Sequence, residues 1–339
     1  MTAEGLKHAW YSTLAMSGLP RLKSRWIGTH NVAVLMYHGV TLESLPFFNW
    51  CFLLQDEFRR QMAYLHQHVD VVPLEQAFDQ VRSGRRPERP RVCITFDDGY
   101  RNNFDVAFPV LREFGFPATV FLATSFLDTQ DLMWDSRLFL AMAGTKGGEV
   151  MWGGIPYRLE GPVEKADSYH QLCQALKPLP QDELGQAIDA LVAQLLGGYG
   201  EGSERSPFDD ARFQMLTSGM IHEMRDSGLV EFGAHTHRHS ILARLDEASQ
   251  REEIDTSIAM VAELTGKRCT TFAYPNGQPS DFTETSKRIL MDHGVDMAVT
   301  TVMGGLHTGS PPLEIPRYGV GGDLSYAMFQ CMVHHMLAG

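Results

Sequence analysis

Residues 92–100, VCITFDDGY, join a short apolar run to two adjacent carboxylates, Asp97 and Asp98. The run 92–96 is rich in β-branched and aromatic residues, which predicts a buried strand. Two carboxylates at the end of such a strand are costly to bury unless something uses their charge, and a divalent cation would. Because Asp and Gly also favour turns, an ordinary turn is the alternative interpretation.

The chain around this stretch alternates between similar runs and segments of helical periodicity. Further strands are predicted at 32–36, 69–72, 118–122, 229–233, 269–273 and 296–300. Between many of them, apolar residues recur at helical spacing, as at Phe58, Met62 and Leu65, and one such helix ends near Gly266. This alternation predicts an α/β fold with a parallel sheet and outer helices. Seven strands suit a closed or nearly closed barrel, and a doubly wound open sheet is the alternative.

Two segments depart from this pattern and suggest a domain organisation. Residues 128–218 hold glycine clusters and one clear helix, near 182–196, so we expect a mixed insertion between two barrel strands that shapes substrate entry. The barrel would then comprise 32–127 and 219–339. The N-terminal segment 1–31 is basic and amphipathic, which indicates either peripheral contact with a membrane or a helix packed on the domain.

The composition narrows the class of protein. The chain has 339 residues, 44% of them hydrophobic, and a net charge of −12, which argues against nucleic acid as a partner. Its five scattered cysteines predict neither a disulfide framework nor a thiolate zinc site, and they suit a reducing compartment. No apolar run of about 18 residues and no signal-like start is present, so we expect a cytoplasmic protein, with membrane association at the inner face as an option.

Three histidines follow the predicted strand 229–233, in the order His235, His237 and His239. The four-residue spacing of His235 and His239 lets two imidazoles converge on one metal ion. We therefore predict these two as metal ligands, with His237 pointing elsewhere.

Three further motifs contain candidate polar groups. FAYPNG, at 272–277, predicts a tight loop whose backbone N–H groups either face a reacting carbonyl oxygen or form an ordinary turn. MYHG places His38 directly after the predicted strand 32–36. Arg317, in IPRY, can pair with a carboxylate through two hydrogen bonds or form a surface ion pair. Because the carboxyl ends of parallel barrel strands share one face, the motifs at those ends should converge there.

With these motifs the chain resembles the polysaccharide deacetylase superfamily, carbohydrate esterase family four, over residues 32–127 and 229–320. The TFDDG and HTxxH elements carry the resemblance, which implies a distorted (β/α)7 barrel and a divalent metal bound by Asp98, His235 and His239. Zinc is the expected metal, with cobalt, nickel or manganese as alternatives. The resemblance also implies that Asp97 is the general base and that the N–H of Asn276 binds the oxyanion.

The sequence departs from that family in two places. Many members carry, at the position of Ala273, an arginine that pairs with the catalytic aspartate, and Arg317 is a candidate to replace it from another strand. The usual C-terminal catalytic histidine is not evident. Deacetylases of the biofilm type that look circularly permuted carry it in a segment similar to 36–38, which assigns the general acid to His38, with His307 as a weaker candidate.

The resemblance implies hydrolysis of the N-acetyl group of an amino sugar in a glycan or glycan precursor. The alternatives are a glycan-binding protein on a decayed deacetylase fold and another metal-dependent amide hydrolase. Tyr100, Tyr274, Trp134 and Trp152 are candidates for substrate contact, and ordinary packing is the alternative for each. Asp135 is a further residue expected to approach the site.

Overall fold

Seven parallel strands close into a barrel. The computed structural model describes residues 3–23, 31–84, 87–197 and 206–336. Around the barrel the strands follow the order β1-β12-β11-β10-β9-β6-β5, and β5 pairs with β1 to complete the ring. Their bounds are β1 (Val32–Tyr37), β5 (Arg91–Phe96), β6 (Ala118–Leu122), β9 (Val230–Ala234), β10 (Thr271–Ala273), β11 (Met297–Met303) and β12 (Ile315–Gly319). The predicted (β/α)7 barrel with an insertion is confirmed, and the open sheet is excluded.

The barrel strands are nearly continuous apolar runs because both of their faces are covered. Every residue of β1 and of β6 is buried. Side chains on one face of each strand fill the barrel, and those on the other pack against helices, as expected for parallel sheets. β1 pairs with β5 in register along its whole length, from Val32 opposite Arg91 to Tyr37 opposite Phe96. This seam brings the ends of β1 and β5 together, where His38 and Asp97 follow.

The prediction of which seven strands form the barrel was wrong at one strand. The expected strand 69–72 forms only β4 (Asp70–Val71), which pairs with the first two residues of β5 and lies outside the ring. The seventh barrel strand is β12, which no strand pattern predicted because Pro316 and Arg317 interrupt its apolar run. β12 nevertheless pairs with β1 and β11 and buries Arg317.

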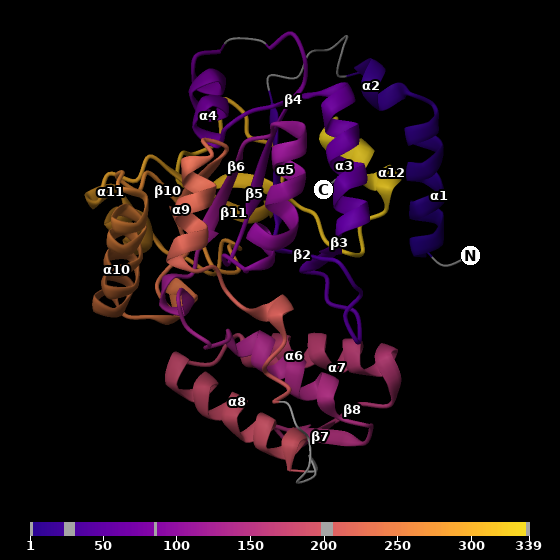
Figure 1. The fold of residues 1–339 in the computed structure, drawn as a ribbon, viewed down its shortest axis with the longest axis vertical. Helices are drawn as coiled ribbons and strands as arrows, with labels where there is room; N and C mark the ends of the chain where they lie inside the picture. Colours follow the sequence, from indigo (N-terminus) through magenta and orange to yellow (C-terminus); the bar gives the residue numbers. More distant parts are fainter. Residues whose placement is uncertain (1–2, 24–30, 85–86, 198–205, 337–339) are drawn as a thin grey trace.

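Helices cover the outside of the barrel (Figure 1). They are α3 (Gln55–His68), α4 (Leu74–Arg82), α5 (Phe108–Phe114), α9 (Ser218–Asp226), α10 (Glu247–Thr265), α11 (Glu284–Asp292) and α12 (Tyr326–Val333). The predicted apolar stripe of α3 is buried, and α10 ends at Gly266 in the left-handed conformation that suits a glycine cap. Two short strands, β2 (Gly39–Thr41) and β3 (Phe52–Leu54), pair beside the end of β1. All five cysteines are free.

The segment between β6 and β9 forms a helical unit against one end of the barrel (Figure 1). It contains α6 (Trp134–Gly144), β7 (Glu149–Trp152), β8 (Ile155–Arg158), α7 (Gly161–Leu176) and α8 (Gln181–Leu196). The expectation of a single helix was therefore wrong, since α8 is one of three. In α6 the run 138–142 is buried without interruption. A helix enclosed on most sides shows no amphipathic stripe that periodicity could detect.

Two N-terminal helices, α1 (Ala3–Met16) and α2 (Leu19–Lys23), precede the barrel, and α1 packs against α12 (Figure 1). Tyr11 is buried, whereas Trp10 is 65% and Met16 80% exposed. Residues 24–30 of the predicted N-terminal segment lie outside the described part of the chain. Within the described part, no helix is long and apolar enough to span a bilayer.

Candidate active site

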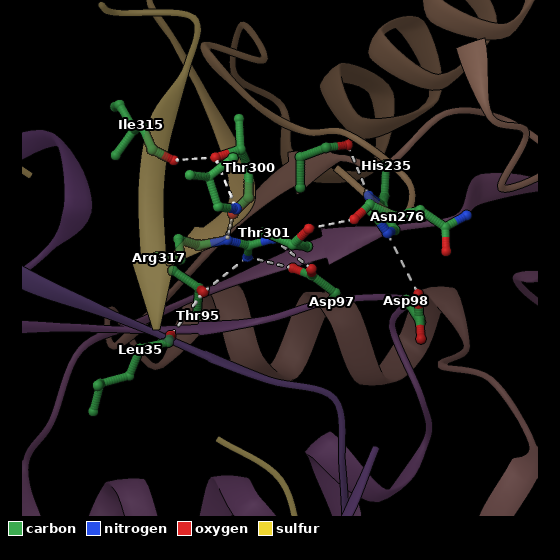
Figure 2. Close-up of polar contacts among 12 residues, drawn as sticks. Leu35, Thr95, Asp97, Asp98, His235, Asn276, Thr300, Thr301, Ile315 and Arg317 are labelled. Atoms are coloured by element: carbon green, nitrogen blue, oxygen red, sulfur yellow. Dashed lines mark hydrogen bonds and ion pairs between the residues drawn. The ribbon is translucent and has the colours of Figure 1, made fainter. Parts of the chain in front are cut away.

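The chain turns sharply after β5, which separates the two adjacent carboxylates. Asp98 has a φ of 75° and Gly99 a φ of 84°. A Cβ on Gly99 would lie 2.8 Å from the Leu122 side chain, so only glycine fits there without a shift. Asp97 is thereby turned toward Arg317 and Asp98 toward His235 (Figure 2). A left-handed conformation at a non-glycine residue is strained, and such strain concentrates at functional sites.

Asp98, His235 and His239 converge as a candidate metal centre. The Nε2 atoms of His235 and His239 lie 3.4 and 3.3 Å from Asp98 Oδ1, and one ligand atom from each residue lies within 4.8 Å of the others. Ligands about 2.0–2.2 Å from one tetrahedral ion lie about 3.3–3.6 Å apart, which these two contacts match. Asp98 Oδ1 is buried and makes no regular hydrogen bond within the described residues. Two imidazoles and one carboxylate with room for a further ligand fit a divalent cation of the zinc type.

Contacts beyond the three side chains orient them. His235 Nδ1 lies 2.7 Å from the carbonyl oxygen of Ala273, which leaves Nε2 to face Asp98. The buried Glu253 accepts a 2.7 Å hydrogen bond from the N–H of Arg238 and holds the loop between the two histidines. His237 points away from Asp98, with its Nδ1 3.0 Å from Thr124 Oγ1.

The charge state of this cluster follows from its contacts. Burial alone would raise the pKa of Asp98, but the polar contacts with His235 and His239 hold that pKa well below its usual value. Burial would lower the pKa of His239, and the contact with Asp98 reverses this and raises it. Asp98 is therefore ionised and ready to act as a ligand.

Asp97 forms a buried ion pair with Arg317. The guanidinium donates two hydrogen bonds, of 2.7 and 2.6 Å, to the two carboxylate oxygens, and both side chains are at most 2% exposed (Figure 2). Arg317 also donates to the Thr300 carbonyl oxygen and to Thr95 Oγ1. Burial would raise the pKa of Asp97, but the charge and hydrogen bonds of Arg317 lower it below the usual value. Arg317 thus supplies, from β12, the guanidinium that the sequence lacks at Ala273.

The loop after β10 presents a backbone donor. Asn276 has a φ of 59° and Gly277 a φ of 64°, and a Cβ on Gly277 would lie 2.8 Å from the Thr301 nitrogen. Thr301 Oγ1 donates to the Asn276 carbonyl oxygen and fixes the turn (Figure 2). The N–H of Asn276 makes no hydrogen bond within the ranges described, so it can donate to an oxygen from outside the protein.

His38 directly follows β1. Its ring meets Trp50 edge-on at a centroid distance of 5.0 Å, and its Nδ1 is buried without a hydrogen bond to any described residue. Burial lowers the pKa of His38, while the charges of Asp98 and Asp97 act in the opposite direction. His307 lies elsewhere, because its neighbour Leu306 pairs with Val32 at the start of β1, the opposite end of the barrel. Of the two histidines, only His38 is near Asp97 and Asp98.

The four residues proposed to contact substrate lie in different environments. Tyr100 and Tyr274 are each 1% exposed; Tyr100 packs against Phe52, and Tyr274 stacks on Phe282. Trp152 lies on β7, on the side of the insertion far from the barrel (Figure 1). Trp134 lines a pocket together with His239, one of the candidate metal ligands.

Several residues of the site carried no recognisable sequence signal. Thr300 and Thr95 anchor Arg317, but isolated threonines in strands are common, so no pattern singled them out. Trp50 contacts His38 from a loop that no motif covers.

Asp135 was expected to approach the site. It interacts electrostatically with Asp98 and His239, and its burial together with the charge of Asp98 raises the pKa of its carboxyl group.

Known proteins share both the sequence pattern and the fold. The sequence profile of the polysaccharide deacetylase family matches residues 84–149 and 196–298. The protein of Bacillus subtilis (strain 168) named "putative polysaccharide deacetylase YxkH" is 33% identical over 103 residues, 29% of this chain and 35% of YxkH. The chain thus matches little more than a third of that relative.

Among solved structures, the deacetylase PplD of Streptococcus pyogenes, in complex with acetate, superposes with a TM-score of 0.59 at 16% identity, over 89% of this chain and 98% of PplD. IcaB of Ammonifex degensii superposes with a TM-score of 0.59 at 21% identity, over 90% of this chain and 97% of IcaB. These two likenesses establish the shared fold. The match to the family's sequence profile, over about half of the chain, shows that the chain belongs to the polysaccharide deacetylase family.

Proposed function

We propose that the protein is a metal-dependent deacetylase that hydrolyses the N-acetyl group of an amino sugar in a glycan or glycan precursor. One observation carries the proposal: an ionised carboxylate, Asp97, is held beside a cluster of one carboxylate and two imidazoles. Hydrolysis of an amide needs a proton acceptor for water, a site for the developing oxyanion and a proton donor for the leaving amine. The chain has a candidate for each role.

Asp97 is the proposed proton acceptor. Its two hydrogen bonds from Arg317 fix the carboxylate plane and keep it ionised, but each oxygen retains a lone pair that can take a proton from water. Asp98, His235 and His239 would hold the cation. When bound, a divalent cation there supplies Lewis-acid chemistry, polarising a carbonyl group and lowering the pKa of water.

Asn276 and His38 fill the other two roles. The Asn276 N–H is a fixed donor for the oxyanion that forms when water adds to the acetyl carbonyl. His38 follows a different strand; burial lowers the pKa of its imidazole, and the charges of Asp98 and Asp97 oppose that shift in part. It is the proposed donor to the leaving amine, so the acid and the base are separate groups in one cleft.

Mass spectrometry of candidate substrates tests the function. Protein loaded with zinc and incubated with N-acetylglucosamine oligosaccharides should produce species that have lost acetyl, and chelator-treated protein should not. The variant His239→Ala should bind less metal and lose turnover, because it removes one of three ligands; elemental analysis measures the metal directly. The control is the surface variant Arg251→Ala, which removes an exposed ion pair with Asp292 and should keep both metal and turnover. Arg244 is not used as the control because it lines the same pocket as His239.

The outcomes separate the alternatives. A glycan-binding protein would bind the oligosaccharide without ever releasing acetate. Another amide hydrolase would leave N-acetyl sugars intact and cleave a small formyl or acyl amide. Either result would overturn the proposed activity.

We further propose that the protein acts in the cytoplasm and touches the inner face of a membrane, where a lipid-linked glycan precursor would be its substrate. Four apolar side chains of α1, α2 and their junction are exposed: Trp10, Met16, Leu19 and Leu22. The same segment carries Lys7, Arg21 and Lys23 in its sequence, which suits an anionic lipid surface.

Vesicle flotation tests this contact. The protein should float with vesicles that contain anionic lipid, and the double variant Trp10→Ser/Leu22→Ser should not, because apolar burial supports attachment. Leu42→Ser is the matched control, since Leu42 is 68% exposed but lies outside α1 and α2. Equal flotation of all three proteins, or of none, would contradict the membrane contact and leave the deacetylase proposal intact.

A further inference from the structure

A pocket next to the metal centre lies between the insertion and the barrel. Trp134, Lys177 and Leu179 line it from the insertion, and His239, Ile241 and Arg244 line it from the barrel. His239 belongs both to this pocket and to the candidate metal centre, so a molecule in the pocket is next to the reacting group.

The pocket is cationic in a strongly acidic protein. Lys177 and Arg244 line it, and no aspartate or glutamate is among its described lining residues. The chain as a whole has a net charge of −12, so acidic side chains greatly outnumber basic ones elsewhere. A positive pocket in such a protein attracts an anion locally, although the molecule as a whole does not.

The two cations are also without ion pairs. Neither Lys177 nor Arg244 lies within 4.0 Å of a carboxylate oxygen in the described part of the chain. Nearby arginines of the same barrel surface behave differently, since Arg238, Arg251 and Arg288 each pair with an acidic side chain. Lys177, just after α7, is partly buried, while Arg244, at the end of the short 3₁₀ helix Leu242–Arg244, is exposed at the mouth.

One carboxylate near the pocket does not cancel this charge. Asp135 acts electrostatically on Lys177 over a longer distance, and also on Asp98 and His239. Asp135 does not line the pocket, whereas Lys177 and Arg244 both do. Arg244 has no such neighbour among the residues that line the pocket.

We propose that this pocket is a subsite for an anionic substituent of the substrate, a carboxylate or a phosphate on the amino sugar or on the unit bonded to it. This inference rests on the proposed deacetylase function and specifies its substrate class. A guanidinium and an ammonium are the side chains that bind such groups, through charge-assisted hydrogen bonds. Because His239 borders both sites, the anionic group must be close to the N-acetyl group, either on the same sugar or on its neighbour.

Matched substrates test the subsite and distinguish its two anion types. The neutral substrate is methyl N-acetylglucosaminide, the phosphate substrate is N-acetylglucosamine 1-phosphate, and the carboxylate substrate is a disaccharide of N-acetylglucosamine and glucuronic acid. The expected result is a higher kcat/KM for at least one anionic substrate than for the neutral one, by about fivefold or more. The anionic substrate with the higher kcat/KM shows whether the pocket binds a phosphate or a carboxylate.

Charge-removing variants assign that preference to this pocket. The ratio of interest is kcat/KM for the anionic substrate divided by kcat/KM for the neutral substrate. Lys177→Met and Arg244→Met should each lower this ratio by about fivefold, mainly by raising KM for the anionic substrate. The control is Lys146→Met, an exposed lysine of the same insertion that does not line the pocket, and it should keep the wild-type ratio. Inorganic phosphate should inhibit the wild type competitively and inhibit both pocket variants more weakly.

The failures of the two proposals differ. If no N-acetyl sugar is hydrolysed, the deacetylase proposal fails. If all three substrates are hydrolysed with equal kcat/KM, or if Lys146→Met lowers the ratio as much as the pocket variants do, the anionic subsite is refuted while the deacetylase stands.

Discussion

Asp97→Asn should lower turnover by about 10²–10⁴-fold while the protein keeps its metal. The amide is nearly the same size as the carboxylate, so the packing around it is preserved. It cannot accept a proton from water, however, and that is the role proposed for Asp97. The candidate metal ligands Asp98, His235 and His239 remain unchanged. Acetate release and metal content, both measured on the same preparation, give the two readouts.

Stability has to be followed in this experiment, because the Asp97→Asn substitution leaves the buried Arg317 without its counter-charge. Assays belong well below the midpoint of thermal unfolding of the variant. The matched control is Asp105→Asn, which removes an aspartate from a partly exposed ion pair with Arg101. It should retain near-full activity. Near-full activity of Asp97→Asn itself would show that another group accepts the proton.

Arg317→Met should destabilise the folded protein by about 3–5 kcal/mol, because it strands an ionised carboxylate in the protein interior. Both partners of the Asp97–Arg317 pair are at most 2% exposed, so water cannot replace the lost hydrogen bonds. Urea unfolding followed by fluorescence measures the change in the free energy of unfolding. Turnover should fall as well, since the pKa of Asp97 rises without the guanidinium.

Two comparisons make this prediction specific to burial. Arg59→Met breaks an ion pair with Glu113 in which both side chains are close to half-exposed, and it should cost less than about 1 kcal/mol. The double variant Asp97→Leu/Arg317→Met removes both charges and should recover much of the stability lost in Arg317→Met. If Arg317→Met were no more destabilising than Arg59→Met, the buried pair would contribute little to the fold.

The convergence of the candidate metal ligands could be predicted from the sequence for a simple reason. Asp98 follows β5, and His235 and His239 follow β9, and both strands are recognisable as apolar runs that end in polar motifs. In a parallel barrel all such ends meet on one face. Knowing the strand direction and the strand ends is therefore enough to bring these residues near each other.

The same reasoning could not find β12 or the insertion helices. Pro316 and Arg317 interrupt the apolar run of β12, so its sequence resembles that of a loop. The arginine is nevertheless buried, because the charge of Asp97 compensates its own. That partner lies 220 residues away, and no local pattern reports it. In α6, burial on most sides removes the periodicity on which helix prediction depends.

By itself, the sequence determined that the chain is a parallel barrel of the deacetylase type with an aspartate and two histidines on one face. Only the tertiary structure decided that Arg317 neutralises Asp97, that His38 rather than His307 borders the site, and that Lys177 and Arg244 share a pocket with His239. Strand ends are encoded locally, in runs of apolar residues and the turns that follow them. Charge compensation and pocket lining depend on which distant segments pack together, and that is settled only when the whole chain has folded.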